Sequence, residues 1–357
     1  MQIRWFEIVG AEAGGRGLLA SLHDGDLTGF GEICLPQAAA QSAALGLLQS
    51  SARLLGAVDG RNINSALDAI ATVTDRDATI GPPVLAALDI ALHDLNGKRR
   101  GCPVHAMLGG RYREEIALSH YLGSGTSLPD REPAGAAVVL EYRGGPTRQA
   151  ASHGVDSAAG WLSGAIGRIG PSVQVDIEAS GAFDNPAVAR TFIEGLLIAG
   201  PRLNLSLIQP LTETDLVGHA TLCETLPIPI VLDGSVRSAA AMGQIVRLGA
   251  ADRVLLSIER VGGLRAAMQV VSLAEAASIG VSSTTRCWTA VGAAAALHLA
   301  SVLHDTLPAR LDNLLVVDGP VAGHGFAVAA GSVKLGDAPG LGIRLHDDAL
   351  LAFRPVL

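Results

Sequence analysis

The sequence has few cysteines and no cluster of them. Its four cysteines are scattered over 357 residues without C-x-x-C spacing, so neither a zinc site nor a disulfide framework is expected. It has no run of basic residues and a net charge of -8, which argues against nucleic acid and anionic membranes as partners. No uninterrupted apolar stretch reaches the length of about 18 residues that a membrane span needs, so no membrane association is predicted.

The first five residues lack the charged and then apolar layout of a signal peptide. We therefore expect a soluble, cytoplasmic protein. Hydrophobic residues make up 49% of the 357 positions, which is enough for one large domain and a smaller companion.

The N-terminal part alternates between strand and helix patterns. Ile3 to Val9, Leu18 to His23 and the segment around Gly29 to Glu32 predict an antiparallel meander with a turn at 24–26. Pro82 and Pro83 then open a predicted helix that runs through Leu95 and stops at Gly97.

From about Ala117 onward, short β-branched runs alternate with helical apolar patterns, as in repeated β-α units. The predicted strands are Ala117–Tyr121, Ala136–Tyr142, Val173–Glu178, Leu205–Ile208, Ile230–Asp233, Arg253–Leu256, Gly280–Ser283 and Ala309–Asp312. Eight strands of this kind favour a TIM-type barrel. About fourteen residues separate the first two strands, which is too short for the usual intervening helix.

Several motifs resemble, in order and spacing, the mandelate racemase and muconate-lactonizing branch of the enolase superfamily. They are the helix at 86–98 (A-A-L-x-x-A-L-W-D-L-x-G-K in the family), 103–111 (P-V-x-x-L-L-G-G-R), 206–211 (W-I-E-Q-P-L), 249–264 (G-A-A-D…R-V-G-G-L) and 338–342 (A-P-G-L-G). The resemblance implies an α/β fold: a (β/α)7β TIM-type barrel of residues 116–324 under an α+β cap of residues 1–115 and 325–357. It also implies a homo-oligomer.

Members of this family hold magnesium between three acidic residues on successive strands, and lysine or histidine bases move the proton α to a substrate carboxylate. Glu178 stands at the first ligand position, and Asp233 stands at the third. The second position is Ile208, which offers no lone pair to a hard cation. We therefore expect no cofactor, although two carboxylates leave room for weak magnesium binding.

The positions of the bases have also changed. Ser257 stands at the lysine that follows the third ligand, and Leu255 at the family's asparagine. On the second strand, direct register puts Val139 and Glu141 on the family's K-x-K pair, and a one-residue slip puts Arg143 on the second lysine. The seventh-strand acid is replaced by Trp288, which follows Arg286 and Cys287.

Two interpretations of the retained carboxylates remain open. Glu178, Asp233 and Arg286 form a candidate catalytic set at the barrel mouth, where this architecture carries function. Alternatively, the two carboxylates belong to a structural ion network with Arg143, Arg237 or Arg286. Asp176 would lie deeper in the barrel, where a buried charge needs a partner.

The other candidates have simple alternatives. Arg143, Arg237, Ser257 and Trp288 are the expected substrate-binding residues, but Trp288 more simply fills the space of the lost acid. Cys287 has no histidine at a recognisable spacing, which favours an ordinary small residue over a nucleophile. His298 on its apolar helix indicates a core or interface residue, and Asp94 and Glu32 are expected to be structural residues of the cap.

Two functions follow for a chain of isomerase or lyase ancestry. One is metal-independent chemistry on a small anionic molecule, with an arginine in place of magnesium as the electrostatic stabiliser. The other is a catalytically silent binding or partner subunit, and retained weak magnesium-dependent isomerase or lyase activity is a further alternative. The distinguishing feature is whether Ile208, Val139 and Trp288 fill the barrel mouth. The sequence favours loss or replacement of the ancestral activity.

Overall fold

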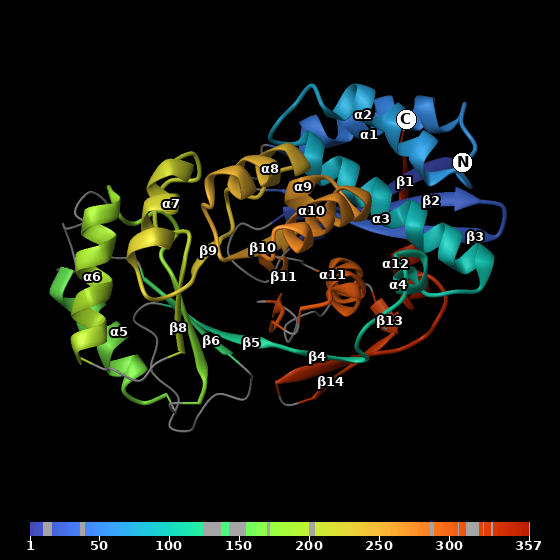
Figure 1. The fold of residues 1–357 in the computed structure, drawn as a ribbon. Helices are drawn as coiled ribbons and strands as arrows, with labels where there is room; N and C mark the ends of the chain where they lie inside the picture. The colour runs from blue at the N-terminus through green and yellow to red at the C-terminus, as the bar shows by residue number, and fades with distance from the viewer. Residues whose placement is uncertain are drawn as a thin grey trace.

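The structure is a computed structural model. It describes residues 1–9, 16–35, 40–123, 137–142, 155–169, 172–199, 204–285, 289–305, 307–311, 321–323, 325–329 and 331–356. A cap of sheet and helices lies against one part of a barrel, and both chain termini lie at the cap (Figure 1).

The cap contains the predicted antiparallel meander. Its strands are β1 (Gln2–Val9), β2 (Arg16–Asp24) and β3 (Leu27–Leu35), and β17 (Arg354–Pro355) adds to β1 from the C-terminal end. Gly25 has a φ of +61° in the turn between β2 and β3, a conformation that glycine adopts without steric cost. The helices α1 (Gln41–Leu55) and α3 (Gly81–Arg100) pack against this sheet, and α2 (Ile63–Thr74) packs against both of these helices.

The predicted end of α3 at Gly97 is wrong, because the helix continues to Arg100 and ends at Gly101 with a φ of 67°. A Cβ built on Gly97 would lie 2.8 Å from the Cα of Gly340. Gly97 is therefore a close-packing position inside the helix, and the segment at 338–342 can approach because this residue has no side chain.

The predicted barrel is confirmed as a parallel eight-stranded sheet whose strands follow chain order. They are β5 (Ser119–Leu122), β6 (Ala137–Glu141), β7 (Gln174–Glu178), β8 (Asn204–Ile208), β9 (Ile230–Leu232), β10 (Arg253–Ser257), β11 (Gly280–Thr285) and β12 (Arg310–Leu311). Ser119 donates its backbone N–H to the carbonyl of Ala309 at 3.0 Å, which joins the first strand to the last. The strand β6 pairs with both neighbours although its connection to β5 is short.

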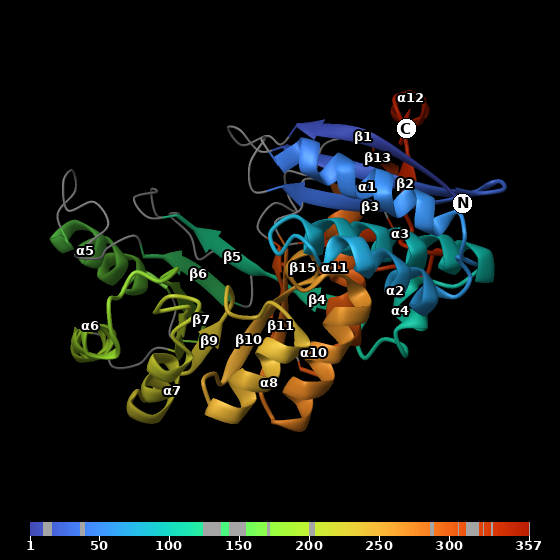
Figure 2. The ribbon, with the colours of Figure 1, turned by 90° about the horizontal axis from the view of Figure 1, so that it is seen from above.

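Helices follow the strands on the outside of the barrel (Figure 2). They are α5 (Val155–Ile166), α6 (Pro186–Ala199), α7 (Leu216–Thr225), α8 (Ala239–Leu248), α9 (Ile258–Val261), α10 (Leu264–Ala276) and α11 (Ala290–Val302). Within the part of the chain that the structure describes, none of the helices is long and apolar enough to cross a membrane.

Shorter elements complete the molecule. They are α4 (Val104–Met107), β4 (Glu115–Ala117), β13 (Val321–Gly323), β14 (Phe326–Ala329), β15 (Ser332–Leu335), β16 (Arg344–Leu345) and α12 (Asp347–Leu351). Ala117, expected at the start of the first barrel strand, belongs to β4, which pairs with β15.

Buried carboxylates of the cap bind backbone N–H groups of other parts of the chain. Glu32 accepts hydrogen bonds from the N–H groups of Thr289 and Gly292, both at 3.1 Å, at the N-terminus of α11. Asp94 accepts from the N–H of Leu341 at 2.8 Å and from Lys98 at 2.7 Å. Charge-assisted bonds of this kind are among the stronger ones in proteins, so Glu32 and Asp94 have the structural role that the sequence indicated.

Candidate functional site at the barrel mouth

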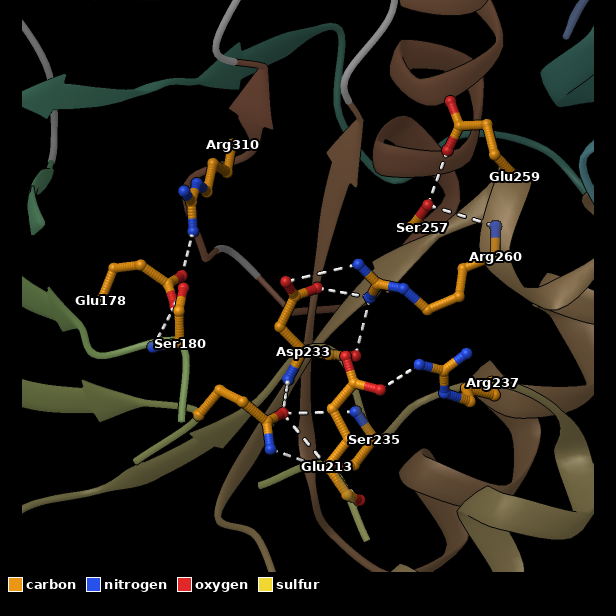
Figure 3. A network of polar contacts seen from close by, with 11 residues as sticks. Glu178, Ser180, Glu213, Asp233, Ser235, Arg237, Ser257, Glu259, Arg260 and Arg310 are labelled. Carbon is orange, nitrogen blue, oxygen red and sulfur yellow. Dashed lines mark hydrogen bonds and ion pairs between the residues drawn. The ribbon is translucent and has the colours of Figure 1, made fainter. Parts of the chain in front are cut away.

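The carboxyl ends of β7, β8 and β9 bring the three expected ligand positions into one region. Glu178 is the last residue of β7, Ile208 is the last residue of β8, and Asp233 directly follows β9. Figure 3 shows Glu178 and Asp233 on the same side of the barrel, each with its side chain directed at an arginine. The predicted strand ends therefore place these residues correctly.

Glu178 forms a buried ion pair with Arg310. The two side chains are 7% and 8% exposed, and Arg310 Nη1 lies 2.5 Å from Glu178 Oε2. The other oxygen, Oε1, accepts hydrogen bonds from the N–H of Ser180 at 3.0 Å and from its hydroxyl at 2.8 Å. Burial raises the pKa of Glu178; Arg310 opposes this rise and the charge of Asp233 adds to it.

Asp233 forms a second ion pair, with Arg260. Arg260 Nη1 lies 2.6 Å from Asp233 Oδ1 and donates to the Asp233 carbonyl at 2.7 Å. Burial alone would lower the pKa of Arg260, but the Asp233 carboxylate outweighs it and the pKa is raised. These side chains are 18% and 26% exposed, so this pair, unlike the first, is in contact with solvent.

Gln209 holds the backbone that carries Asp233. Its side-chain oxygen accepts from the N–H groups of Asp233 at 3.1 Å and Ser235 at 3.2 Å. Gln209 itself has a φ of 44°, a left-handed conformation that is uncommon for a residue with a side chain. The Gln of the 206–211 motif therefore ties the end of β8 to the end of β9.

Ile208 lies in a small apolar cluster inside the barrel. It packs with Val139, Val231 and Leu255, and Tyr121 packs against this group. Ile208 and Val139 are each only 1% exposed. Of the three side chains that would distinguish a filled barrel mouth from an open one, Ile208 and Val139 are therefore buried inside the barrel; the third, Trp288, lies outside the described residues.

The structure describes the second strand as far as Tyr142. Val139 and Glu141 pair with Asp176 and Glu178 of β7, and Val139 lies inside the barrel with Ile208. That Val139 and Glu141 stand at the family's two lysine positions stays a prediction. The alternative residue, Arg143, lies outside the described residues.

Ser257, at the expected lysine position, binds within the chain. Its hydroxyl donates to Glu259 Oε2 at 2.6 Å and accepts from the N–H of Arg260 at 3.3 Å, which caps α9. The other oxygen of Glu259 accepts from the hydroxyl of Thr285. A serine hydroxyl in this place is no substitute for a lysine base at neutral pH.

The expected arginine partners differ from those in the structure. Arg237, which is 58% exposed, pairs with Glu213 and not with Glu178 or Asp233, so its predicted place in their ion network is wrong. Its predicted role in binding substrate stays a prediction. Arg286, Cys287 and Trp288 lie outside the described residues.

A small cavity lies inside the barrel, next to the apolar cluster. Its volume is about 30 Å³, and Ile208, Val139, Asp176, Arg253 and Arg310 are among its lining residues. That volume holds one or two water molecules. Asp176 accepts hydrogen bonds from Ser206 at 2.6 Å and from Gln174 at 2.8 Å. The sequence led us to expect a partner for this carboxylate, and both of these partners are uncharged side chains.

Sequence reasoning missed the two arginines of the site. Arg310 is a charged residue within a short, otherwise apolar strand segment, and its side chain points into the barrel, where a charge needs a partner. In the sequence, Arg260 is distinguished only as the first residue of the R-V-G-G-L motif. Since Arg310 lies 132 positions from Glu178, only strand order connects them.

The side chains present do not fit a magnesium site built from three carboxylates. Magnesium demands oxygen ligands in near-octahedral geometry, whereas Ile208 offers none, and Glu178 and Asp233 are each bonded to a guanidinium. Among the described residues, no group of three His, Cys, Asp or Glu side chains is arranged to hold a metal ion. That the protein binds no magnesium stays a prediction.

Two family models match the chain. Residues 18–109 match the N-terminal domain of mandelate racemase / muconate lactonizing enzyme, and residues 155–349 match the enolase C-terminal domain-like family. Together they include most of the cap and the strands β7 to β12 that carry the site.

Curated relatives and solved structures agree with these matches. An N-succinyl-L-Arg/Lys racemase of Bacillus cereus is 26% identical over 75% of this chain and 71% of its own length. Muconate cycloisomerase 1 of Rhodococcus opacus is 29% identical over 74% and 70%. The crystal structure of muconate cycloisomerase from Pseudomonas fluorescens superposes with a TM-score of 0.84 at 24% identity, over 99% of this chain and 98% of its own.

Another solved structure contains a metal. A dipeptide epimerase from Cytophaga hutchinsonii, complexed with Mg and the dipeptide D-Ala-L-Val, superposes with a TM-score of 0.83 at 18% identity, covering 99% of this chain and 98% of its own. This likeness concerns the fold alone.

Proposed function

Because the chain belongs to the mandelate racemase and muconate lactonizing enzyme branch of the enolase superfamily, we propose that it has lost the magnesium-assisted abstraction of an α-proton. It acts as a catalytically silent binding or partner subunit with the fold of its family. The relatives are racemases, epimerases and cycloisomerases, so the proposal concerns a departure from inherited chemistry.

The observation that carries this proposal is the apolar cluster inside the barrel. Ile208, Val139 and Leu255 stand where the resemblance places a metal ligand, a lysine base and an asparagine, and they pack against one another. Such a cluster offers no oxygen ligand to a cation and no group that could accept a proton. It therefore removes two parts of the reaction at once, the Lewis acid and the base.

The energetic consequence is large. Polarisation by a metal and a positioned base each contribute several kcal/mol of transition-state stabilisation. Since every 1.36 kcal/mol is about a factor of ten in rate, losing both together lowers the rate by several orders of magnitude.

Exchange of the α-proton tests this proposal. In heavy water with magnesium present, N-succinyl amino acids, dipeptides and mandelate should show no deuterium incorporation above the protein-free background, because no base reaches the α-proton and no metal binds the substrate carboxylate. The measurement is NMR or mass spectrometry of the recovered compounds. Deuterium incorporation by the wild-type chain that disappears in Asp233→Asn would defeat the proposal.

A second candidate function is metal-independent chemistry on a small anionic molecule at the outer part of the mouth. Two features favour it: the partial exposure of the Asp233–Arg260 pair, and the raised pKa of Glu178, which keeps more of this group protonated for general acid catalysis. Arg286, which follows β11, is the proposed clamp for the anion, since a guanidinium binds carboxylate or phosphate through two parallel hydrogen bonds.

Binding of small anions tests this second candidate function. If it holds, calorimetric titration with succinate, an N-acyl amino acid or phosphate should detect binding, and Arg286→Ala should weaken it at least tenfold because the clamp is lost. Arg190→Ala, which removes an exposed arginine paired with Glu194 on α6, is the matched control. Equal affinity in wild type and Arg286→Ala would remove Arg286 from the site.

A further inference from the structure

We infer that Arg310 and Arg260 take the electrostatic place of a divalent cation in this barrel, and that Arg310 excludes the metal. The inference rests on the proposed loss of the magnesium site and adds a cause to it. The carboxylate ligand expected at position 208 is missing, because an isoleucine stands there. In addition, arginines of the same chain already neutralise the two remaining carboxylates.

The charges at the site balance without a metal. Glu178 and Asp233 contribute two negative charges, and each is bonded to one arginine at 2.5 or 2.6 Å. The resemblance implies three carboxylates around a doubly charged ion. Here an isoleucine removes one negative charge, and two guanidinium groups supply the two positive charges.

The carboxylate oxygens are also engaged by hydrogen bonds. Both oxygens of Glu178 have donors, Arg310 on Oε2 and Ser180 on Oε1. Arg260 reaches both oxygens of Asp233, at 2.6 and 3.4 Å. An incoming cation would have to displace these donors and would meet the positive charges that they carry. Such repulsion is strong where water is excluded.

Arg310 is the arginine that is harder to displace. Its side chain is buried, and its guanidinium carbon lies 5.2 Å from the centre of the Tyr121 ring, a distance typical of a cation–π contact. Arg310 and Ile208 also line the same internal cavity. A ligand-bearing side chain introduced at position 208 would therefore enter the space beside Arg310.

Rebuilding the metal site tests the inference. Four proteins are compared: wild type, Ile208→Glu, Arg310→Met and the double variant Ile208→Glu/Arg310→Met. Melting temperature is measured with EDTA and with millimolar manganese or magnesium chloride, and bound manganese is counted by electron paramagnetic resonance.

Wild type and Ile208→Glu should show no metal-dependent shift, because Arg310 still bonds Glu178. The double variant should gain one manganese per chain and a rise in melting temperature of at least about 3 °C, because the metal neutralises the carboxylates at positions 178 and 208, which no longer have Arg310 as a partner. If that variant does not fold, Ile208→Asn/Arg310→Met supplies an oxygen ligand without a further charge. The double variant Ile208→Glu/Arg190→Met, which removes a surface arginine, should behave like Ile208→Glu.

The inference is overturned if Ile208→Glu alone binds manganese as tightly as the double variant, since Arg310 would then not exclude the metal. It is also overturned if wild type binds metal, or if both folded double variants bind none. These outcomes differ from failure of the proposed function, which is read from deuterium exchange by the wild-type chain.

Discussion

Replacing Arg310 with methionine is expected to lower the free energy of unfolding by roughly 3–5 kcal/mol, because a buried carboxylate is left without its partner. Methionine retains much of the length of the side chain but removes the charge that Glu178 contacts at 2.5 Å. Among the described residues, Ser180 would then be the remaining hydrogen-bond donor to the Glu178 carboxylate. Urea denaturation monitored by circular dichroism, at constant pH and salt, measures the loss.

Two controls show whether the loss comes from the ion pair. The double variant Glu178→Leu/Arg310→Met removes both charges, and it should recover a large part of the stability that Arg310→Met loses. The substitution Arg190→Met, at an exposed pair whose atoms lie 3.5 Å apart, should cost less than about 1 kcal/mol. If Arg310→Met costs no more than Arg190→Met, the pair with Glu178 is not held away from water.

The second large effect concerns acid stability and His298. This side chain is buried on α11, and burial, together with the neighbouring His105, lowers its pKa to about 3. The folded pKa lies below the ordinary value of 6.5, so the unfolded chain binds the proton first as the pH falls. Stability should therefore be lost between pH 6.5 and about 3, by up to roughly 1.4 kcal/mol for each pH unit.

A conservative variant isolates this effect. His298 Nδ1 accepts the N–H of His105 at 3.2 Å, and in His298→Asn an amide oxygen can take that role without titrating. The variant should have a flatter stability profile below pH 6.5. The charged groups near His105 are Asp337, 3.6 Å from its Nε2, and Arg111, and both are retained. Parallel profiles for the two proteins would show that His298 does not control acid unfolding.

Much of the fold was predictable from local patterns in the sequence. The meander in the cap follows from its strand patterns and from turn residues such as Gly25, and the eight barrel strands follow from short β-branched runs between helical patterns. All of these signals depend on near neighbours in the chain. The end of α3 was not predictable in this way. Gly97 looks like a helix stop, but it faces Gly340, a contact that exists only after the C-terminal segment has folded back onto the helix.

The candidate site was likewise predictable only in part. The sequence by itself determined that Glu178, Ile208 and Asp233 lie at successive strand ends, because a parallel barrel brings those ends to one face. It also determined that Ile208 cannot bind a cation. It did not show that Val139, Val231 and Leu255 would meet Ile208 inside the barrel.

Only the tertiary structure decided which arginines neutralise the carboxylates. Arg237 is close to Asp233 in the chain, yet it lies on the surface with Glu213. Arg310 is 132 positions from Glu178, yet closure of the barrel brings it within 2.5 Å. Ion pairing depends on distance in space and on exclusion of water, and both quantities are set by the way the last strand meets the first.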